Sequence, residues 1–361
     1  SLVRRPCRRG ARVSARTNRP LTLKVMAGRL GVSTATVSNA FNRPDQLSRE
    51  LREHIPTECR KAGYRGPNAA ARSLRTGRTG IIGVTMSNYL SYSFSDPVAH
   101  QFLQGLADVF ESREYSLLLM PSREHLSQPH SFESFVDGFV VYGPPQSEKL
   151  DQLVALNKSL IAVDFDIDGH ASVNIDNYEG AKTIAMHAVR TLKPSTTAIL
   201  GLRLLDVNRI CRVQESEVFD RRKAITTQRL HGFLDGAQTG GIQVPSERIW
   251  HVPDNNHTLS LQAATEALTS APRPELLLCM SDCIALAAIE AARNLRLRIP
   301  EDVRITGFDD IPEASTMRPS LTTMHQQSLV KGRIAAKIFL GQMEERHVVL
   351  PTQLMVRESC P

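Results

Sequence analysis

The sequence predicts a small all-α head joined to a larger α/β body with two lobes and parallel sheets. Three observations predict this fold class. Positive charge is concentrated in the first 80 of the 361 residues. Three short helical patterns follow one another between residues 24 and 62. From Gly80 onward, apolar strand-like runs alternate with amphipathic helical patterns, which is typical of parallel sheets with helical crossovers.

Charge divides the chain into two unlike parts. Residues 1–80 contain 18 Lys and Arg against four Asp and Glu, whereas residues 81–361 contain 26 against 33. A basic end on an acidic body indicates that only the first part meets a polyanion, although a basic segment can also be merely solvated. The Arg-rich residues 1–20 lack the apolar stretch of a secretory signal, and we expect them to be disordered.

The six cysteines show neither a CxxC motif nor the spacing of a disulfide framework. Cys279 and Cys283 lie in an apolar run, where the favoured interpretation is two small buried side chains rather than a metal or disulfide pair. No apolar run approaches the roughly 20 residues of a membrane helix. We therefore expect a cytoplasmic protein with no membrane partner, no metal site and no cofactor.

The head is expected to fold as three short helices. The first covers residues 24–30 and ends at Gly31, a favourable residue for a left-handed turn. Ser33 can cap the second, residues 34–42, and Ser48 can cap the third, because a serine hydroxyl accepts a free backbone N–H. Two helices joined by such a tight turn predict a helix-turn-helix, whose second helix enters the major groove of DNA.

The second helix carries side chains suited to DNA. Thr34, Ala35 and Asn39 share one face and can contact base edges, because short side chains meet the thymine methyl group and an amide pairs with adenine. Four further polar side chains can bond phosphates: Ser33, Thr36, Ser38 and Asn42. The alternative is that the Ser and Thr residues at this helix start serve only as caps.

In the body, strands are expected at residues 81–86, 116–120, 138–142, 160–165, 197–201, 249–252, 276–280 and 303–308. Helices are expected at residues 97–113, 146–156, 178–192, 228–239, 258–270, 283–295 and 328–341. Residues 204–225 are polar and unpatterned and are expected to form a long surface loop. Ligands of such sheets bind beyond the carboxyl ends of the strands.

Two motifs in the first 80 residues resemble the LacI/GalR family of transcription regulators. They are Gly31-Val-Ser33-x-x-Thr36-Val-Ser38-x-x-x-Asn42 and Gly63-Tyr64-x-x-Pro67-Asn68-x-x-Ala71, followed by Leu74. The segment Gly307-Phe-Asp309-Asp310 resembles the family's body. The resemblance implies a periplasmic-binding-protein-like body and a homodimeric repressor in the bacterial nucleoid. It would bind double-stranded operator DNA under the control of a sugar-like effector.

The resemblance adds five residues to the DNA-binding set, namely Thr22, Tyr64, Asn68, Ala71 and Leu74. It makes residues 68–75 a hinge helix that orders on the operator, with Leu74 as an apolar wedge in the minor groove. The sequence alone leaves a second interpretation open, in which Leu74 packs against the body.

Candidate effector-binding residues lie at strand ends and on one helix of the body. Asp309 follows an apolar strand, where its carboxylate can accept ligand hydroxyls, although an aspartate there can also be a turn residue. The resemblance implies that Arg229 faces the same ligand, where its guanidinium can bind ligand oxygens. It also implicates Asp164 and Ser281 at analogous positions. Phe94, in an aromatic cluster after the first strand, could stack on the effector or simply pack.

The domain organisation follows from these assignments. It comprises a tail (1–20), a DNA-binding domain (21–66), a hinge helix with linker (67–79) and an effector-binding, dimerising body (80–356). In the loop 204–225, basic residues at 221–223 could bring cations to an anionic effector, or could simply be solvated. A periplasmic sugar-binding protein is the alternative from the transport class. The absence of a GxGxxG motif after a strand, and of a P-loop, argues against an enzyme.

Overall fold

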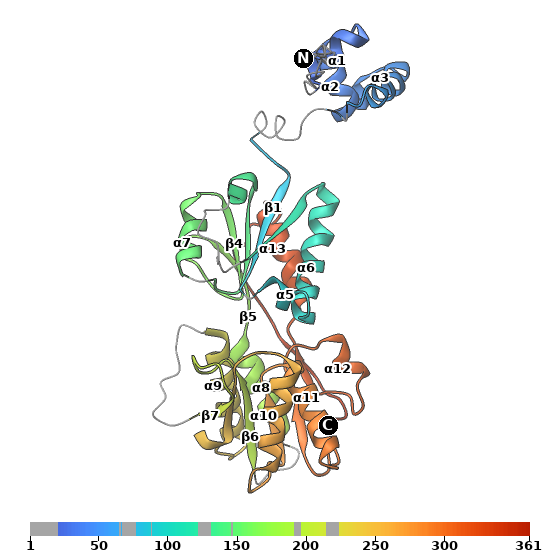
Figure 1. Cartoon of the computed structure of the whole chain (residues 1–361). Coiled ribbons are helices and arrows are strands. Elements are labelled where there is room, and N and C mark those ends of the chain that lie inside the picture. The colour runs from blue at the N-terminus through green and yellow to red at the C-terminus, as the bar shows by residue number, and fades with distance from the viewer. Residues whose placement is uncertain are drawn as a thin grey trace, which may run out of the picture. The chain divides into compact units, whose positions relative to one another are not determined.

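The computed structural model describes residues 21–64, 66, 77–87, 89–121, 131–145, 147–190, 196–213 and 224–361. The chain divides into two compact units, Ser1–Thr79 and Gly80–Pro361 (Figure 1). The expected disordered tail, the hinge helix 68–75 and the basic residues 221–223 lie outside the described residues.

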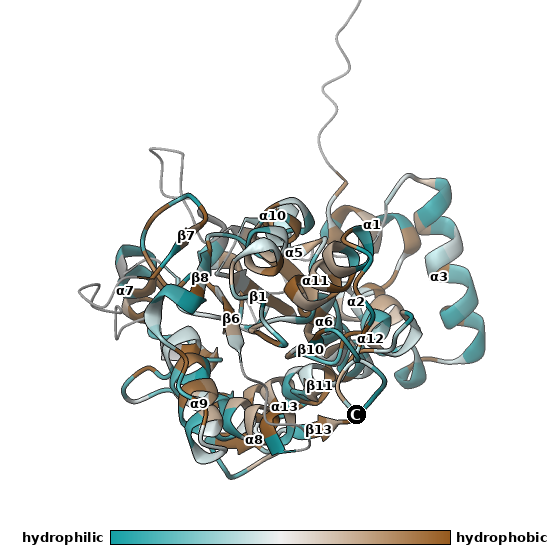
Figure 2. Cartoon of the chain, turned by 90° about the horizontal axis from the view of Figure 1, so that it is seen from below, coloured by the Kyte–Doolittle hydropathy of each residue, from teal (hydrophilic) through white to brown (hydrophobic). Residues whose placement is uncertain are grey.

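The first unit contains the three expected helices. These are α1 (Leu23–Leu30), α2 (Thr34–Asn42) and α3 (Arg49–Lys61), with a short 3-10 turn, η1 (Pro44–Gln46), before α3. Gly31 ends α1 with a φ of 66°, a conformation that glycine adopts without strain. The apolar faces of the helices meet in a small core that includes Met26, Val37 and Ile55. Figure 2 shows that α3 is otherwise mostly hydrophilic.

The upper lobe of the body in Figure 1, here the N-lobe, is built on a parallel six-stranded sheet of order β12-β5-β4-β3-β1-β2. The strands are β1 (Ile81–Met86), β2 (Ser116–Pro121), β3 (Gly138–Tyr142), β4 (Ser159–Val163), β5 (Ala171–Ile175) and β12 (His347–Leu350). Its helices are α5 (Leu90–Ser93), α6 (Pro97–Phe110), α7 (Ser147–Ala155) and α13 (Ser328–Phe339), with 3-10 turns η2 (Glu111–Arg113) and η3 (Ser131–Phe135).

The other lobe, here the C-lobe, has a five-stranded sheet of order β10-β9-β6-β8-β7, in which only β7 is antiparallel. The strands are β6 (Thr197–Leu202), β7 (Cys211–Arg212), β8 (Ile249–Val252), β9 (Leu276–Cys279) and β10 (Arg304–Thr306). Its helices are α8 (Asn177–Arg190), α9 (Ala224–Thr239), α10 (His257–Thr269), α11 (Asp282–Asn294) and α12 (Pro312–Thr316), with a 3-10 turn, η4 (Ser246–Arg248). These two lobes confirm the predicted α/β fold class.

The prediction that residues 204–225 form one long surface loop is wrong for part of this segment. β7 lies inside it and pairs with β8, and the side chains of Leu204 and Val213 are buried (4% and 2% exposed). These isolated apolar residues pack against the core, which gives the segment a structure that its polar composition hides. α9 also begins four residues earlier than the expected helix at 228.

The chain passes between the lobes three times. It leaves the N-lobe after β5, returns after β11 (Thr323–His325), and leaves again after β12 towards β13 (Gln353–Met355). β11 and β13 pair antiparallel, and the Gln327 side chain donates to the Pro351 carbonyl at 2.6 Å, which ties the second and third crossovers together. Neither lobe is therefore one continuous piece of chain.

Helices α6 and α13 of the N-lobe pack closely against each other. A Cβ atom at Gly105 would lie 2.0 Å from the Leu329 carbonyl oxygen, and one at Gly332 would lie 2.2 Å from that of Phe102. Only glycine at both positions allows this backbone approach. The contact fixes α13, whose side chains reach both the outer surface and the region between the lobes.

Candidate functional site

The N-terminal end of α2 presents the side chains expected to meet DNA. Ser33 caps the helix by accepting the Thr36 backbone N–H at 3.0 Å, and the two hydroxyls lie 2.8 Å apart. Thr34 and Ala35 are exposed in the turn between them. The cap therefore fixes a helix start whose outer face carries small and polar groups, which suits contact with base edges and phosphates.

Further along α2, amide side chains are held in defined positions. The Asn42 amide donates to the Ser38 carbonyl at 3.0 Å and to its hydroxyl at 3.2 Å. The Asn39 amide donates to the Gln46 side chain at 3.5 Å, and Asn39 is half-buried. These bonds orient Asn39 and Asn42 before any ligand is present.

Two residues expected at the DNA have structural roles in the head. Tyr64 is 6% exposed, and its ring packs edge-on against Phe41 with centroids 6.0 Å apart, so its ring belongs to the head core rather than to the surface. The Thr22 hydroxyl accepts the Val25 backbone N–H at 3.4 Å and caps α1. Asn68, Ala71 and Leu74 lie outside the described residues.

A connected set of buried polar side chains spans the two lobes, here the interlobe cluster. Its members are Asp164, Asn177, Arg229, Asp309, Gln326 and Lys331. It brings together three of the five predicted effector-binding residues: Asp164, Arg229 and Asp309. The cluster lies at the carboxyl ends of β4 and β10 and at the second crossover, where the topology places ligands.

Arg229, on α9, is the centre of the C-lobe half of the cluster. Its guanidinium donates to the Asn177 side chain at 2.9 Å, to the Met280 carbonyl at 2.8 Å and to Asp309 at 3.5 Å. It also lies over the Phe308 ring, 3.7 Å from the ring centre. Arg229 is only 8% exposed, so these contacts compensate for the burial of its charge.

Asp309 is held in a strained backbone. Its φ is 143° and that of Asp310 is 58°, values that residues other than glycine rarely adopt. The Asp309 carboxylate accepts hydrogen bonds from Arg229, from Gln326 at 2.7 Å and from the Asp282 backbone at 3.3 Å. Burial raises the pKa of Asp309, and the neighbouring Arg229 opposes that rise.

Lys331, on α13, is the centre of the N-lobe half. It is fully buried, and its ammonium donates to both oxygens of Asp164 at 2.8 Å and to the Gln326 side-chain oxygen at 3.2 Å. The Gln326 amide in turn donates to Asp309. Lys331 and Gln326 therefore connect the predicted carboxylate of one lobe to that of the other.

Ser281 lies at the border of this cluster. Its hydroxyl caps α11 by accepting the Ile284 N–H at 3.2 Å and donates to the Asn255 side chain at 2.6 Å. The residues on either side of it contact Arg229 and Asp309. Ser281 is 1% exposed, and its hydroxyl is already used to cap α11 and to position the Asn255 side chain.

The aromatic residue that reaches across the lobes is Tyr92, not the predicted Phe94. Tyr92 is a hydrogen-bond partner of the Asn255 side chain, and the Arg203 guanidinium lies 5.7 Å from its ring centre. Burial raises the pKa of the Tyr92 phenol. Phe94 is 60% exposed, and its backbone carbonyl pairs with His100 at 2.8 Å.

Sequence reasoning missed Lys331 and Gln326. A signal for Lys331 was present, because it shares a helical face with Ala335 and Ile338, both of which are buried. A lysine at such an apolar position needs a buried partner. Gln326 gave no such signal, because its role depends on the crossover that places it between the lobes.

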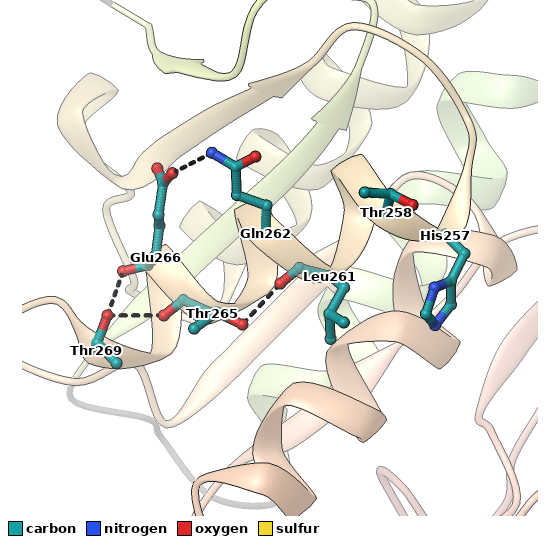
Figure 3. A pocket seen from close by; sticks show the side chains of 7 residues that line it. All are labelled: His257, Thr258, Leu261, Gln262, Thr265, Glu266 and Thr269. Atoms are coloured by element: carbon teal, nitrogen blue, oxygen red, sulfur yellow. Dashed lines mark hydrogen bonds between the residues drawn. The ribbon is translucent and has the colours of Figure 1, made fainter.

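A shallow groove follows the outer side of α10 (Figure 3). It is lined by His257, Thr258, Leu261, Gln262, Thr265, Glu266 and Thr269. Its polar groups largely bond within the same helix, for example Gln262 with Glu266 at 3.0 Å, so few of them are available to bind a ligand. Within the described ranges, no group of three His, Cys, Asp or Glu side chains could hold a metal ion, and no helix is long and apolar enough to cross a membrane.

A helix-turn-helix head with an exposed recognition-helix start, followed by a two-lobed α/β body with a buried interlobe cluster, defines a DNA-binding regulator. A family model described as a periplasmic binding protein-like domain matches residues 208–360. An HTH-type transcriptional regulator of Mycolicibacterium smegmatis is 33% identical over 332 residues, which cover 89% of this chain and 90% of that protein. The HTH-type transcriptional regulator IpsA of Corynebacterium glutamicum is 31% identical, with 91% and 92% covered.

Solved structures agree with these relatives. A LacI family transcriptional regulator from Corynebacterium glutamicum superposes with a TM-score of 0.68 at 26% identity, covering 95% of this chain and all of that one. The chain belongs to the LacI family of transcriptional regulators. This membership confirms the predicted family and supports a regulator over the transport-type sugar-binding protein that the sequence left as an alternative.

Proposed function

We propose that this protein is a homodimeric repressor that binds an operator through α2 and releases or retains it according to a small hydroxylated effector at the interlobe cluster. The observation that carries the proposal is the connection of Asp164 to Asp309 through Lys331 and Gln326. A ligand that bonds these carboxylates and Arg229 contacts both lobes at once.

The mechanism is a shift between lobe arrangements. The interlobe cluster lies beside the second crossover, because Gln326 immediately precedes the Gln327 that bonds Pro351. A ligand that rearranges these bonds favours one arrangement of the lobes over the other by the difference in its affinity for the two. In a dimer, that change alters the spacing of two heads on successive half-sites.

Similar proteins support both halves of the proposal. One neighbour is a complex of the regulator CelR with cellobiose, at 24% identity and a TM-score of 0.63. Another is the lac repressor dimer bound to operator and an anti-inducer, at 21% identity and a TM-score of 0.72. At these identities the likeness establishes the fold, and the ligands belong to those proteins.

The test combines DNA binding with a ligand screen. Genomic fragments retained by the full chain define an operator, and fluorescence anisotropy then measures affinity at several salt concentrations. Affinity should fall steeply with salt, because phosphate contacts release counterions. Thermal shift against sugars, sugar phosphates, nucleosides and purines identifies the effector, which should change operator affinity in the intact protein and not in Arg229→Ala. A flat salt response would reject the DNA assignment, and unchanged ligand affinity in Arg229→Ala would reject the site.

The hinge assignment has its own test. Leu74→Ala should weaken binding to the operator while sparing most binding to random DNA, because a wedge contributes only where the duplex is bent. Equal losses on both kinds of DNA would show that the wedge role of Leu74 is wrong.

A further inference from the structure

Among the described residues around the interlobe cluster, three Lys and Arg side chains each face a carboxylate. The pairs are Lys331 with Asp164 (2.8 Å), Arg229 with Asp309 (3.5 Å) and Arg203 with Asp254 (2.6 Å). Two further carboxylates, Asp96 and Asp282, lie close enough to Asp309 to act on its charge. In the described part of the chain, carboxyl groups therefore outnumber Lys and Arg side chains around the interlobe cluster.

Lys331 differs from an ordinary ligand-binding lysine because its ammonium has no hydrogen left to donate. An ammonium carries three N–H groups, and here two go to Asp164 and one to Gln326. Its side chain is 0% exposed. A phosphate or carboxylate could bind this ammonium only by displacing Asp164 or Gln326. In the first case Asp164 would be buried without its partner, and in the second the anion would lie beside the buried Asp164 carboxylate.

Asp164 keeps some capacity for a ligand. Its side chain is 9% exposed, and each carboxylate oxygen has a second lone pair beyond the one that Lys331 uses. A ligand hydroxyl can donate to that lone pair without breaking the ion pair. An anionic ligand would instead face the charge of a buried carboxylate, at a cost that low local dielectric increases.

We propose that the Lys331–Asp164 pair sets the ligand class of this protein: it admits an uncharged, hydroxyl-rich ligand and rejects phosphorylated or carboxylated ones. This inference rests on the proposed effector site and narrows it. Lys331 acts as a positioning and specificity-determining residue, because it neutralises Asp164 by donating to both of its carboxylate oxygens and positions the Gln326 side chain that bonds Asp309.

The test makes the ammonium available to an anion. Asp164→Asn keeps the shape of the side chain and removes its charge, so Lys331 becomes a buried cation without a carboxylate. Asp108→Asn is the matched control, because Asp108 pairs with Arg333 on the same helix α13 at 2.6 Å, but at an exposed position. The probe is inorganic phosphate, titrated into the full-length proteins at constant ionic strength, with Tm as the readout.

The native chain and Asp108→Asn should show no saturable rise in Tm with phosphate, apart from any effect of phosphate on the DNA-binding head, which is identical in all variants. Asp164→Asn should show a Tm that rises by about 2–4 °C and then saturates, and the double variant Asp164→Asn with Lys331→Met should lose that rise. Folding of each variant is checked by circular dichroism. If Asp164→Asn is folded and does not respond, the inference is wrong.

A second arm uses the native chain alone and does not depend on the variant folding. Glucose and glucose 6-phosphate, and inositol and inositol phosphate, are compared in pairs. Saturable binding of a phosphorylated member that is lost in Arg229→Gln would overturn the inference while leaving the proposed effector site standing. Operator release by an uncharged member would support both, whereas an effector whose action survives Arg229→Gln would overturn the proposed site itself.

Discussion

The guanidinium carbon of Arg229 lies 3.7 Å from the centre of the Phe308 ring, so the side chain that pairs with Asp309 also stacks on the residue immediately before it. Stacking and pairing hold the same planar group from two directions. A planar guanidinium can make both contacts, whereas an ammonium cannot reproduce that geometry.

Arg229→Lys should therefore lose contacts that its charge cannot restore. We expect the free energy of unfolding of the body to fall by about 1–3 kcal/mol, because the Asn177 and Met280 acceptors lose a donor. Denaturant unfolding measures the loss. Arg298→Lys is the control: Arg298 makes a forked ion pair with Asp302, but its side chain is 72% exposed, so its variant should leave stability nearly unchanged. Equal effects would show that burial of the Arg229 site has no energetic importance.

Gly105→Ala should destabilise the N-lobe. The new methyl group would meet the Leu329 carbonyl at 2.0 Å and force α6 and α13 apart, at a cost of about 1–3 kcal/mol or more. Gly28→Ala is the opposite case, because Gly28 is exposed in α1 with nothing within 4 Å of the added atom. It should stabilise the head by up to about 1 kcal/mol. Thermal unfolding of both variants tests whether Gly105→Ala lowers stability and Gly28→Ala raises it. Unchanged stability of Gly105→Ala would contradict the close contact between α6 and α13.

Ser33→Ala and Ser48→Ala remove equivalent caps from α2 and α3. Each should lower the stability of the head by about 1 kcal/mol, because each leaves a helical N–H without its acceptor. Only Ser33→Ala should weaken DNA binding beyond the loss of folded head, because only α2 is assigned to the groove. Anisotropy measured well below the unfolding temperature separates the two effects. A greater loss of affinity in Ser48→Ala would move the recognition surface to α3.

The buried carboxyl of Asp282 should make stability depend on pH. Burial raises the pKa of Asp282 to about 6, from an ordinary value of 3.8. The folded state then holds the proton more tightly than the unfolded state between about pH 4 and 6. Its contribution to stability is complete below about pH 4, falls as pH rises through 6, and is constant above. The change is on the order of 3 kcal/mol at most.

Asp302 provides the contrasting control. Hydrogen bonds from Arg298 lower the pKa of Asp302 to about 2, so its contribution is present above about pH 4 and is lost as pH falls towards 2. Unfolding free energies of the native chain, Asp282→Asn and Asp302→Asn, measured from pH 3 to 7, should therefore diverge in opposite directions. Parallel profiles for the native chain and Asp282→Asn would exclude the Asp282 effect.

Much of this fold was predictable because its strands are apolar runs and its helices are amphipathic. Four strands near the crossovers, β5, β11, β12 and β13, were missed because they are short and are flanked or interrupted by polar side chains such as Ser172 and Asn174, which leaves no clear apolar run to detect. The same reason applies to β7. The packing of the Tyr64 ring could not be predicted, because a family motif says which residue recurs, whereas only the tertiary structure shows that this ring lies against Phe41.

The interlobe cluster was only half predictable. Asp309 stood out as a polar residue directly after a strand, and Arg229 and Asp164 were identified through the family resemblance. Their partners Lys331 and Gln326 lie more than 15 residues away in sequence and reach them only through the second crossover. Local pattern therefore identifies the charges, and tertiary structure decides which charges are neutralised.

The three passages between the lobes also bear on biosynthesis. The edge strand β12 of the N-lobe sheet and the helix α13 that packs on that sheet are synthesised after nearly all of the C-lobe. A nascent chain can complete the head early, but its N-lobe stays unfinished until residues near 350 have left the ribosome. Ser359 also bonds Thr322 and Ile305 of the C-lobe, so a chain that stopped before His347 would leave both lobes incomplete together.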